Sequence, residues 1–327
     1  MKKLLTIIGL AAFSLAGITS AKAQTAFTIG NMVIYRVGDG STALSSSATN
    51  ISLLEVSTSG SVAQTINVPT TGGSRLTASG TATSEGKLRS NGGYIAITGY
   101  DSALGTANVA GTTDPRRSLV YGANGSLTTT LTFTGGAGSP YGANNIRGAV
   151  PNATGTAVWT AGHESTTGTP NGFYYLTNSS ETQLVSANVR TVDIFGGQLY
   201  GTTAAGSDTR AFTIGTGLPT TTGQALGALN GLPTTGSNYG SMQIFDLDGS
   251  SGFDTIYLAN GNNIEKWSFN SGTWTLNNSV NAGSAVMDFT ASLSGSTVNM
   301  YVITATDLFL LADASGYNAN ITASFSS

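Results

Sequence analysis

The stretch from Gly240 to Val280 constrains the fold more than any other part of the chain. It contains four short apolar runs, each closed by Gly, Asn, Asp or Ser. Short runs rich in Ile, Tyr, Phe, Trp and Thr between turn-forming residues predict β-strands, and connections this short allow only an antiparallel meander. The inner runs, QIFDL and TIYLA, are apolar on both faces, so both faces must be covered. A four-stranded meander packed between two others is one blade of a β-propeller.

A hairpin of the same kind recurs along the chain. Each copy consists of an apolar run, a turn rich in Gly, Asn and Ser, and a second apolar run. The copies lie at 51–68, 118–133, 173–187, 264–278 and 308–323. Asn and Gly tolerate the positive φ that tight hairpins require. The mean spacing of these repeats is about 51 residues, which is typical of propellers and about twice the length of a β-helix coil.

We therefore predict a single all-β domain over residues 24–327, folded as a six-bladed β-propeller of four-stranded antiparallel blades. The predicted blades cover approximately 26–70, 77–135, 143–187, 188–230, 240–280 and 284–325. The first unit has no convincing strand before the run at 31–38, so we expect it to lack its innermost strand. The last hairpin should provide the outermost strand of the sixth blade. A seven-bladed propeller and a parallel β-helix are the alternatives.

The N-terminus predicts export. Residues 1–23 combine two early lysines, a short apolar core and a final Ala-Lys-Ala, the pattern of a signal peptide cleaved between Ala23 and Gln24. The apolar core is too short to span a membrane comfortably, so we expect a secreted protein, extracellular or periplasmic, without a membrane span. Cleavage leaves ten basic against 16 acidic residues and no basic cluster, so nucleic acid is not an expected partner. The absence of Cys excludes disulfides, thiol nucleophiles and Cys-ligated metals.

Four segments of the chain resemble a known family. They are FTIGNMVIYRVGDGS, RLTASGTATSEG, YIAITGYDSALGTANVAGT and TVDIFGGQLYGTT. They are similar to an uncharacterised family of secreted bacterial propeller-like proteins and modules, and the similarity covers nearly the whole mature chain. The resemblance implies the propeller fold and the extracellular location. It implies no activity, because the family has none assigned.

One loop has the spacing of a calcium site. Asp246, Asp248, Ser250 and Asp254 occupy positions 1, 3, 5 and 9 of the run DLDGSSGFD, with a carbonyl available at position 7. Oxygen ligands at this spacing wrap Ca²⁺, and the loop resembles those of propeller domains in integrin α-subunits. The sequence therefore predicts calcium as a possible cofactor. The alternative is that Asp and Gly simply form the turn between two strands.

A second candidate site lies at one mouth of the predicted central channel. Glu85, Arg147 and Arg190 fall near the starts of successive innermost strands, so they should gather at the same end. A glutamate between two arginines would satisfy buried charges, or the group would bind a small anion such as a carboxylate. His163 is the only histidine, which leaves no second one for a zinc site or a His-based catalytic pair.

The leading functional hypothesis is a non-enzymatic, exported propeller that binds an extracellular glycan or protein or serves as a structural part of the surface. The poverty in His, Cys and carboxylates favours it. Among aromatic residues that could stack on a sugar, Trp274 is the one expected to be exposed, because it lies on a predicted outer strand.

Two other functions are weighed against it. A lactonase-like hydrolase would hold a divalent metal at the channel mouth with four side chains, but the arginines at the same mouth would repel a cation. The four side chains are Glu85, Asn145, Asp193 and Asp288. A surface assembly subunit would use the open edge of the incomplete first blade to accept a strand from a partner protein or from another copy of itself.

Overall fold

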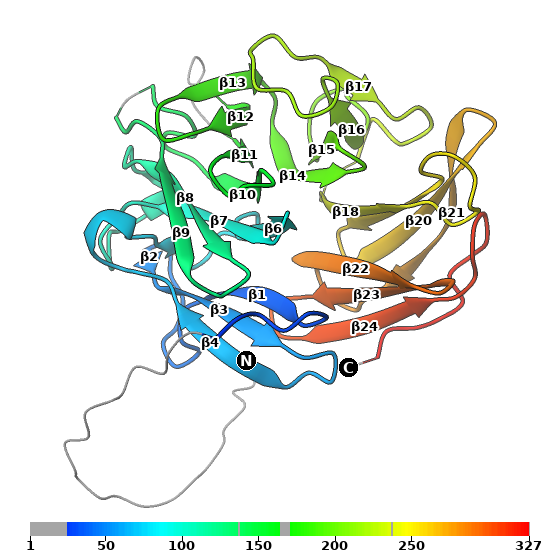
Figure 1. Cartoon of the computed structure of the whole chain (residues 1–327), viewed down its shortest axis with the longest axis horizontal. Helices are drawn as coiled ribbons and strands as arrows, with labels where there is room; N and C mark the ends of the chain where they lie inside the picture. The colour runs from blue at the N-terminus through cyan, green and yellow to red at the C-terminus, as the bar shows by residue number, and fades with distance from the viewer. Residues whose placement is uncertain (1–24, 137, 164–170, 237, 327) are drawn as a thin grey trace, which may run out of the picture.

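The computed structural model describes residues 25–136, 138–163, 171–236 and 238–326. Within these ranges the regular structure consists of β-strands and two short 3₁₀ turns, η1 (Gly72–Ser74) and η2 (Val109–Gly111). Figure 1 shows the strands as small sheets that follow one another around a centre in chain order. The predicted all-β, propeller-like fold is therefore confirmed. No helix of the described residues is long and apolar enough to cross a membrane.

The hydrogen-bonded sheets divide the chain into groups of consecutive strands, which we number blades 1 to 6. Blade 1 has β1 (Met32–Val37), β3 (Ile51–Val56) and β4 (Val62–Asn67). Blade 2 has β6 (Lys87–Asn91), β7 (Tyr94–Tyr100), β8 (Arg116–Gly122) and β9 (Leu127–Thr132). Blade 3 has β10 (Ile146–Pro151), β11 (Val158–Gly162), β12 (Gly172–Leu176) and β13 (Glu181–Val185).

Blade 4 has β14 (Val189–Phe195), β15 (Gln198–Thr203), β16 (Ala211–Ile214) and β17 (Leu226–Ala228). Blade 5 has β18 (Tyr239–Phe245), β19 (Thr255–Asn260), β20 (Asn263–Asn270) and β21 (Thr273–Asn281). Blade 6 has β22 (Asp288–Ser294), β23 (Thr297–Ile303) and β24 (Leu308–Asp313). A separate two-stranded sheet pairs β2 (Ala48–Thr49) with β5 (Ala78–Ser79). In blades 2 to 6 the first strand lies nearest the centre and the later strands follow outward (Figure 1).

Blades 2 and 3 touch at the centre, where their innermost strands β6 and β10 form a parallel pair and join both blades into one eight-stranded sheet. Gly148 lies opposite Lys87 in this pair. A Cβ at Gly148 would lie 2.7 Å from the Cβ of Lys87 and 2.8 Å from its carbonyl oxygen. The glycine therefore permits a close approach that a side chain would prevent.

Apolar clusters lie between successive blades and form the core. Examples are Leu53 against Leu119 for blades 1 and 2, and Ile264 against Met300 for blades 5 and 6, each pair within one buried cluster. Further clusters join blades 2 and 3, 3 and 4, and 4 and 5. Among the described residues, no buried cluster joins blade 6 to blade 1. The ring is therefore packed at five of its junctions and open at the sixth.

Strands beside this opening are less covered than their counterparts elsewhere. Every residue of the innermost strand β10 is buried, whereas most residues of β22 are exposed, including Leu293 at 44%. In β23, alternate residues such as Tyr301 and Ile303 remain only half-buried. Blade 1 contains three strands, and β1 pairs with β3 alone. This topology agrees with the expectation that the first blade lacks its innermost strand.

The last blade differs from the expected four-stranded form. The sequence predicts a hairpin over 308–323, but only its first strand, β24, is formed, and the end of the chain returns to β24 in a single bridge between Leu310 and Ser326. The segment between them crosses blade 5 instead. There Asn278 exchanges two hydrogen bonds with the backbone of Ile321, at 2.9 Å each. Hydrogen bonds from a side chain of blade 5 therefore hold this backbone in place of the partner strand of a hairpin.

Candidate functional site

The innermost strands meet in an ionic network centred on Arg89 of β6. The Nε of Arg89 lies 2.8 Å from Oδ2 of Asp193 on β14, and its Nη1 lies 2.9 Å from Oδ2 of Asp288 on β22. Its Nη2 also donates to Oδ1 of Asp288 at 3.2 Å, and the hydroxyl of Ser241 on β18 donates to the same carboxylate. Arg89 is 7% exposed. One guanidinium thus connects blades 2, 4 and 6 across the centre of the ring.

The two carboxylates of this network differ in acidity. Burial raises the pKa of Asp193 to about 6, although Arg89 opposes the rise. Burial also acts on Asp288, but Arg89 and Lys87 hold the pKa of its carboxyl below the usual range. The difference follows from the contacts, because Asp288 receives two hydrogen bonds from Arg89 and one from Ser241. Proton uptake near neutral pH is therefore expected at Asp193.

Glu85, which the sequence places at the channel mouth, is bound to neutral groups. Its carboxylate accepts hydrogen bonds from the Tyr100 hydroxyl and the Asn145 side-chain amide, and from the backbone N–H of Ser79 at 3.2 Å. Burial raises the pKa of Glu85 despite these hydrogen bonds. Glu85 therefore links blades 2 and 3 through three hydrogen bonds from neutral donors.

The two arginines predicted beside it lie next to each other, and Arg147 binds the start of β14. The Nη1 of Arg147 donates to Oδ1 of Asn188 at 2.7 Å and to the carbonyl oxygen of Val189 at 2.6 Å. These contacts bring the Arg147 guanidinium to the start of β14, next to Arg190. Among the described residues, neither arginine forms an ion pair with Glu85. The predicted Glu–Arg–Arg group is therefore two adjacent arginines with a glutamate nearby.

The four residues considered for a lactonase-type metal form two separate pairs. Glu85 and Asn145 are hydrogen-bonded to each other, whereas Asp193 and Asp288 share Arg89. Each pair is already engaged with a donor or a cation. Within the described ranges, three carboxylates close enough to share a metal ion occur only at Asp246, Asp248 and Asp254. The structure does not assemble the four into one site.

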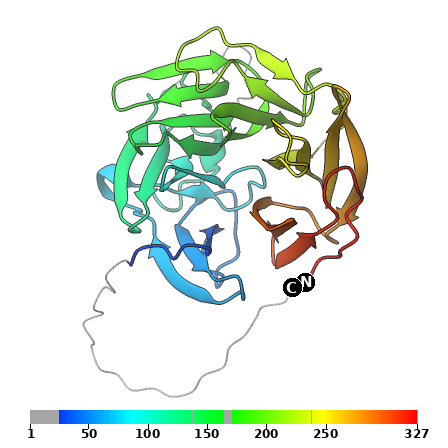
Figure 2. The same ribbon diagram turned by 45° about the vertical axis from the view of Figure 1, so that its right-hand side comes forward.

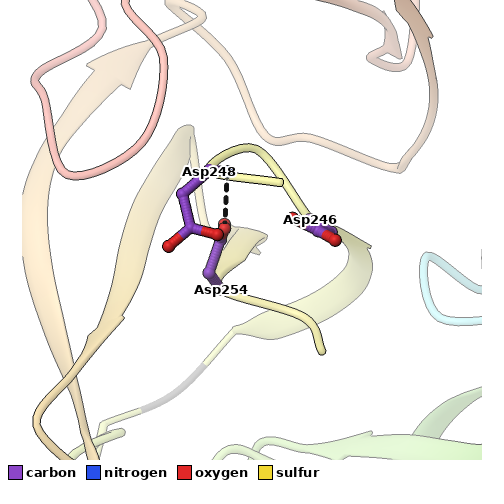
Figure 3. Close-up of side chains that lie close together, drawn as sticks. All are labelled: Asp246, Asp248 and Asp254. Carbon is purple, nitrogen blue, oxygen red and sulfur yellow. Dashed lines mark hydrogen bonds between the residues drawn. The ribbon is translucent and has the colours of Figure 1, made fainter. Parts of the chain in front are cut away.

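The acidic loop after β18 brings together three of the four residues predicted to bind calcium. One oxygen from each of Asp246, Asp248 and Asp254 lies within 4.8 Å of the others (Figure 3). Asp254 is buried, and its Oδ2 accepts the backbone N–H groups of Leu247 at 3.0 Å and Asp248 at 2.8 Å.

Backbone N–H groups of the loop also donate to the other two carboxylates. Asp246 accepts the N–H of Gly249 at 2.9 Å, and Asp248 accepts that of Ser250 at 2.7 Å. Ser250 contributes a backbone donor in this arrangement. The loop's conformation is therefore explained by turn hydrogen bonds alone, and calcium stays a prediction from the sequence.

A cavity of about 720 Å³ lies at the opening between blades 6 and 1. In Figure 2 the blue strands of blade 1 and the orange-red strands of blade 6 face each other there. The walls of the cavity include residues of β1, β6, β14 and β22, and the Arg89–Asp193–Asp288 network forms part of its lining. A volume of this size is in the range of protein binding sites. The sequence indicated this cavity only indirectly, because the first repeat lacks a strand.

The tryptophans do not offer a surface for sugars. Trp159, Trp267 and Trp274 are all buried, which corrects the expectation that Trp274 is exposed. The loop after β17 covers this outer strand, since the backbone N–H of Trp274 donates to the carbonyl of Asn230 at 2.8 Å, and its ring packs on Phe269. A stacking platform for a glycan therefore has no support from these side chains.

No protein-family model matches the chain, and no curated protein matches it. Among solved structures, it is similar to a protein from Bacteroides uniformis ATCC 8492 that is provisionally assigned as a 6-phosphogluconolactonase, with 13% identity, 90% of this chain and 82% of that chain covered, and a TM-score of 0.46. A protein from Bacteroides fragilis NCTC 9343 with the same provisional assignment is 12% identical over 91% of this chain and 82% of that chain, with a TM-score of 0.48. A chain of a mitotic checkpoint complex is 12% identical over 98% of this chain and 99% of that chain, with a TM-score of 0.43. At these values the similarities support no inference about activity.

Proposed function

We propose that this protein is an exported β-propeller that binds an extended segment of a partner polypeptide in the cavity between blades 6 and 1. The observation that carries the proposal is the position of that cavity, because it lies where the other blades have an innermost strand. The bound segment would serve as that strand and close the ring. The predicted signal peptide supports export, and the poverty in catalytic side chains supports a binding function.

The edge of β1 that faces away from β3 supports pairing with such a segment. Gly38 N–H donates to the carbonyl of Asn50 at 2.8 Å, so this pair is one of the hydrogen-bonded pairs of the ladder. Hydrogen-bonded and non-bonded pairs alternate in an antiparallel ladder. Val33 and Tyr35 therefore point their backbone N–H and C=O groups away from β3, and no described backbone group pairs with them. An exposed edge of this kind can accept an added strand.

The walls of the cavity indicate what the segment should look like. On one side they contain Val33, Tyr35 and Leu88, and on the other Phe289 and Tyr301. Because a strand presents alternate side chains to opposite faces, apolar residues on both faces would cover both walls. The charges that line the cavity are already paired with one another. The best occupant is therefore an extended, uncharged, apolar segment.

The segment should come from another polypeptide. Within the described residues, every strand is already paired in its own sheet, so a second copy has no spare strand to donate from this part. The innermost strand of blade 5, Tyr239–Phe245 (YGSMQIF), shows a suitable chemistry, since it is uncharged and mostly apolar. A synthetic peptide with this sequence is a suitable probe of the cavity.

Titration calorimetry of the mature chain (24–327) with this peptide tests the proposal. We expect micromolar binding and slower hydrogen exchange at the amides of Val33 and Tyr35. Two further peptides, N-methylated at alternate backbone amides, keep the side chains but block one edge each. One of the two should bind at least tenfold more weakly, because only one edge of the segment pairs with β1.

Val33 supplies a matched pair of variants. Val33→Pro removes a free-edge donor, which an edge strand tolerates, and should weaken peptide binding at least tenfold, whereas Val33→Ala keeps the N–H and should bind almost as well as the wild type. Equal binding of both methylated peptides, or no binding of the unmodified one, would overturn the proposal. So would protection of these amides that appears without peptide and increases with protein concentration, since a second copy would then fill the cavity.

A further inference from the structure

Three cations lie together where the innermost strands of blades 2, 3 and 4 meet. We call Lys87, Arg147 and Arg190 the basic cluster. Gly148 pairs with Lys87, and Arg147 precedes Gly148 in a β-bulge. Both Arg147 and Arg190 lie close enough to Lys87 for their charges to lower the pKa of its ammonium. The hydrogen bonds of Arg147 to the residues just before Arg190 bring these two side chains to the same place. Each of the three blades thus contributes one cation.

None of these cations forms an ion pair with an acidic residue in the described part of the chain, although Asp288 attracts Lys87 and Glu85 attracts Arg147 from a longer distance. Lys87 is 6% exposed, and its ammonium makes no hydrogen bond or ion pair with the described residues. Arg147 is 4% exposed, its Nη1 binds only neutral oxygens, and its buried Nε has no partner. Half-buried Arg190 forms no hydrogen bond or ion pair with any described residue. Buried cations are usually paired, because removing an unpaired charge from water is costly.

The nearby carboxylates offset this charge only in part. Asp193 and Asp288 form their ion pairs with Arg89, and the hydrogen bonds of Glu85 come from neutral groups. Counting Arg89, its two carboxylates and Glu85 with the basic cluster, four cations face three anions, a net charge of +1. The surplus of positive charge affects the acidity of these groups. Burial lowers the pKa of Lys87, and burial together with the charge of Arg190 lowers the pKa of Arg147 to about 9.

We propose that the basic cluster is a binding site for a small oxyanion of the phosphate or dicarboxylate class. Such an anion would supply the missing countercharge and accept hydrogen bonds from Lys87, from the unpaired Nε of Arg147 and from Arg190. Guanidinium groups favour these anions because their donors match the geometry of two oxygens. The site is separate from the cavity between blades 6 and 1, since none of the three cations lines that cavity.

Thermal melting of the mature chain tests the proposal with two named probes, inorganic phosphate and succinate, against sodium chloride at equal ionic strength. We expect at least one probe to raise the melting temperature in a saturable way, and the probe that acts identifies the class of anion. If neither raises it beyond the chloride control, the proposal is wrong.

Replacing Lys87 separates a ligand site from a structural cluster. Lys87→Met keeps the length of the side chain and removes an unpaired buried charge. It should therefore raise the melting temperature of the anion-free protein and abolish the rise with the anion. Arg75→Met is the matched control, because it removes one positive charge from a partly exposed ion pair with Asp101 and should leave the anion effect unchanged. A lower melting temperature for Lys87→Met with an unchanged anion effect would contradict the proposal.

Arg190→Met provides an independent variant, because Arg190 makes no described contact that folding requires. Calorimetry should show at least tenfold weaker binding of the active anion. Val33→Pro, which blocks the proposed strand pairing, should leave anion binding unaltered, so the two proposals fail or succeed separately. An Arg190→Met variant that binds the anion as tightly as the wild type would contradict an anion site at the basic cluster.

Discussion

Replacement of Arg89 by methionine should strongly destabilise the protein, because Arg89 is the cation that two buried carboxylates share. Its nitrogens lie 2.8 Å from Asp193 and 2.9 Å from Asp288, and the arginine is 7% exposed. Removing one partner of a buried ion pair typically costs about 3–5 kcal/mol. Both carboxylates lose their partner here, so we expect the free energy of unfolding to fall by about 4 kcal/mol at pH 7.5.

The loss should depend on pH in a defined direction. The pKa of Asp193 is already raised to about 6 with Arg89 present, and it will rise further without it. A carboxyl whose pKa is raised in the folded state binds a proton more readily when folded, so it adds stability as the pH falls. The folded variant should hold about one proton more than the folded wild type at pH 7.5 and about half a proton more at pH 6, so the difference in stability should shrink by about 1.5 kcal/mol over this range.

Urea denaturation followed by tryptophan fluorescence measures this effect, because all three tryptophans are buried. Arg75→Met, which breaks a partly exposed ion pair, should cost less than about 1 kcal/mol. Adding Asp193→Asn to Arg89→Met should recover part of the lost stability, since it removes one of the two buried carboxylates that Arg89 no longer neutralises. A loss below about 1 kcal/mol at pH 7.5, or one that is the same at pH 6, would refute the reasoning.

Three further substitutions probe other parts of the structure. Gly148→Ala should cost about 1–3 kcal/mol in urea denaturation, because its Cβ would lie 2.7 Å from a side chain of β6, whereas the control Gly240→Ala, with 3.9 Å of space, should have little effect. Lys266→Met should lower the melting temperature by removing the fully buried partner 2.7 Å from Asp313, at a cost of about 3–5 kcal/mol, and adding Asp313→Asn should recover part of it. If the acidic loop binds calcium, millimolar Ca²⁺ should raise the melting temperature and EDTA should reverse the rise. Asp254→Asn should lower the melting temperature even in EDTA, because this carboxylate holds the loop backbone.

Local patterns in the sequence were sufficient for most strands. The run TIYLA lies in β19, which is buried along almost its whole length, as two apolar faces require. The run QIFDL overlaps the end of β18, and its last two residues belong to the loop that follows. The absence of an apolar run before β1 was equally visible, and it corresponds to the free edge of blade 1. Such features are readable because a strand's period and its turns depend only on neighbouring residues.

Predictions failed where a segment is held by residues far away in the sequence. Trp274 is buried by a loop of blade 4, and the segment around Ile321 is bound by Asn278 of blade 5. Both stretches have the local pattern of exposed outer strands. Nothing in their own residues shows that another part of the chain covers them, so only the packed structure decides.

The all-β class, the repeated hairpins, the incomplete first blade and the charged residues of the innermost strands follow from local sequence patterns. How those charges combine depends on the folded ring. Arg89 forms ion pairs with both carboxylates, one of them 199 residues away, whereas Lys87 forms no ion pair with any residue that the structure describes. The physical reason is that strand periodicity sets which way a side chain points, whereas closure of the ring sets which strands meet at its centre and which junction stays open.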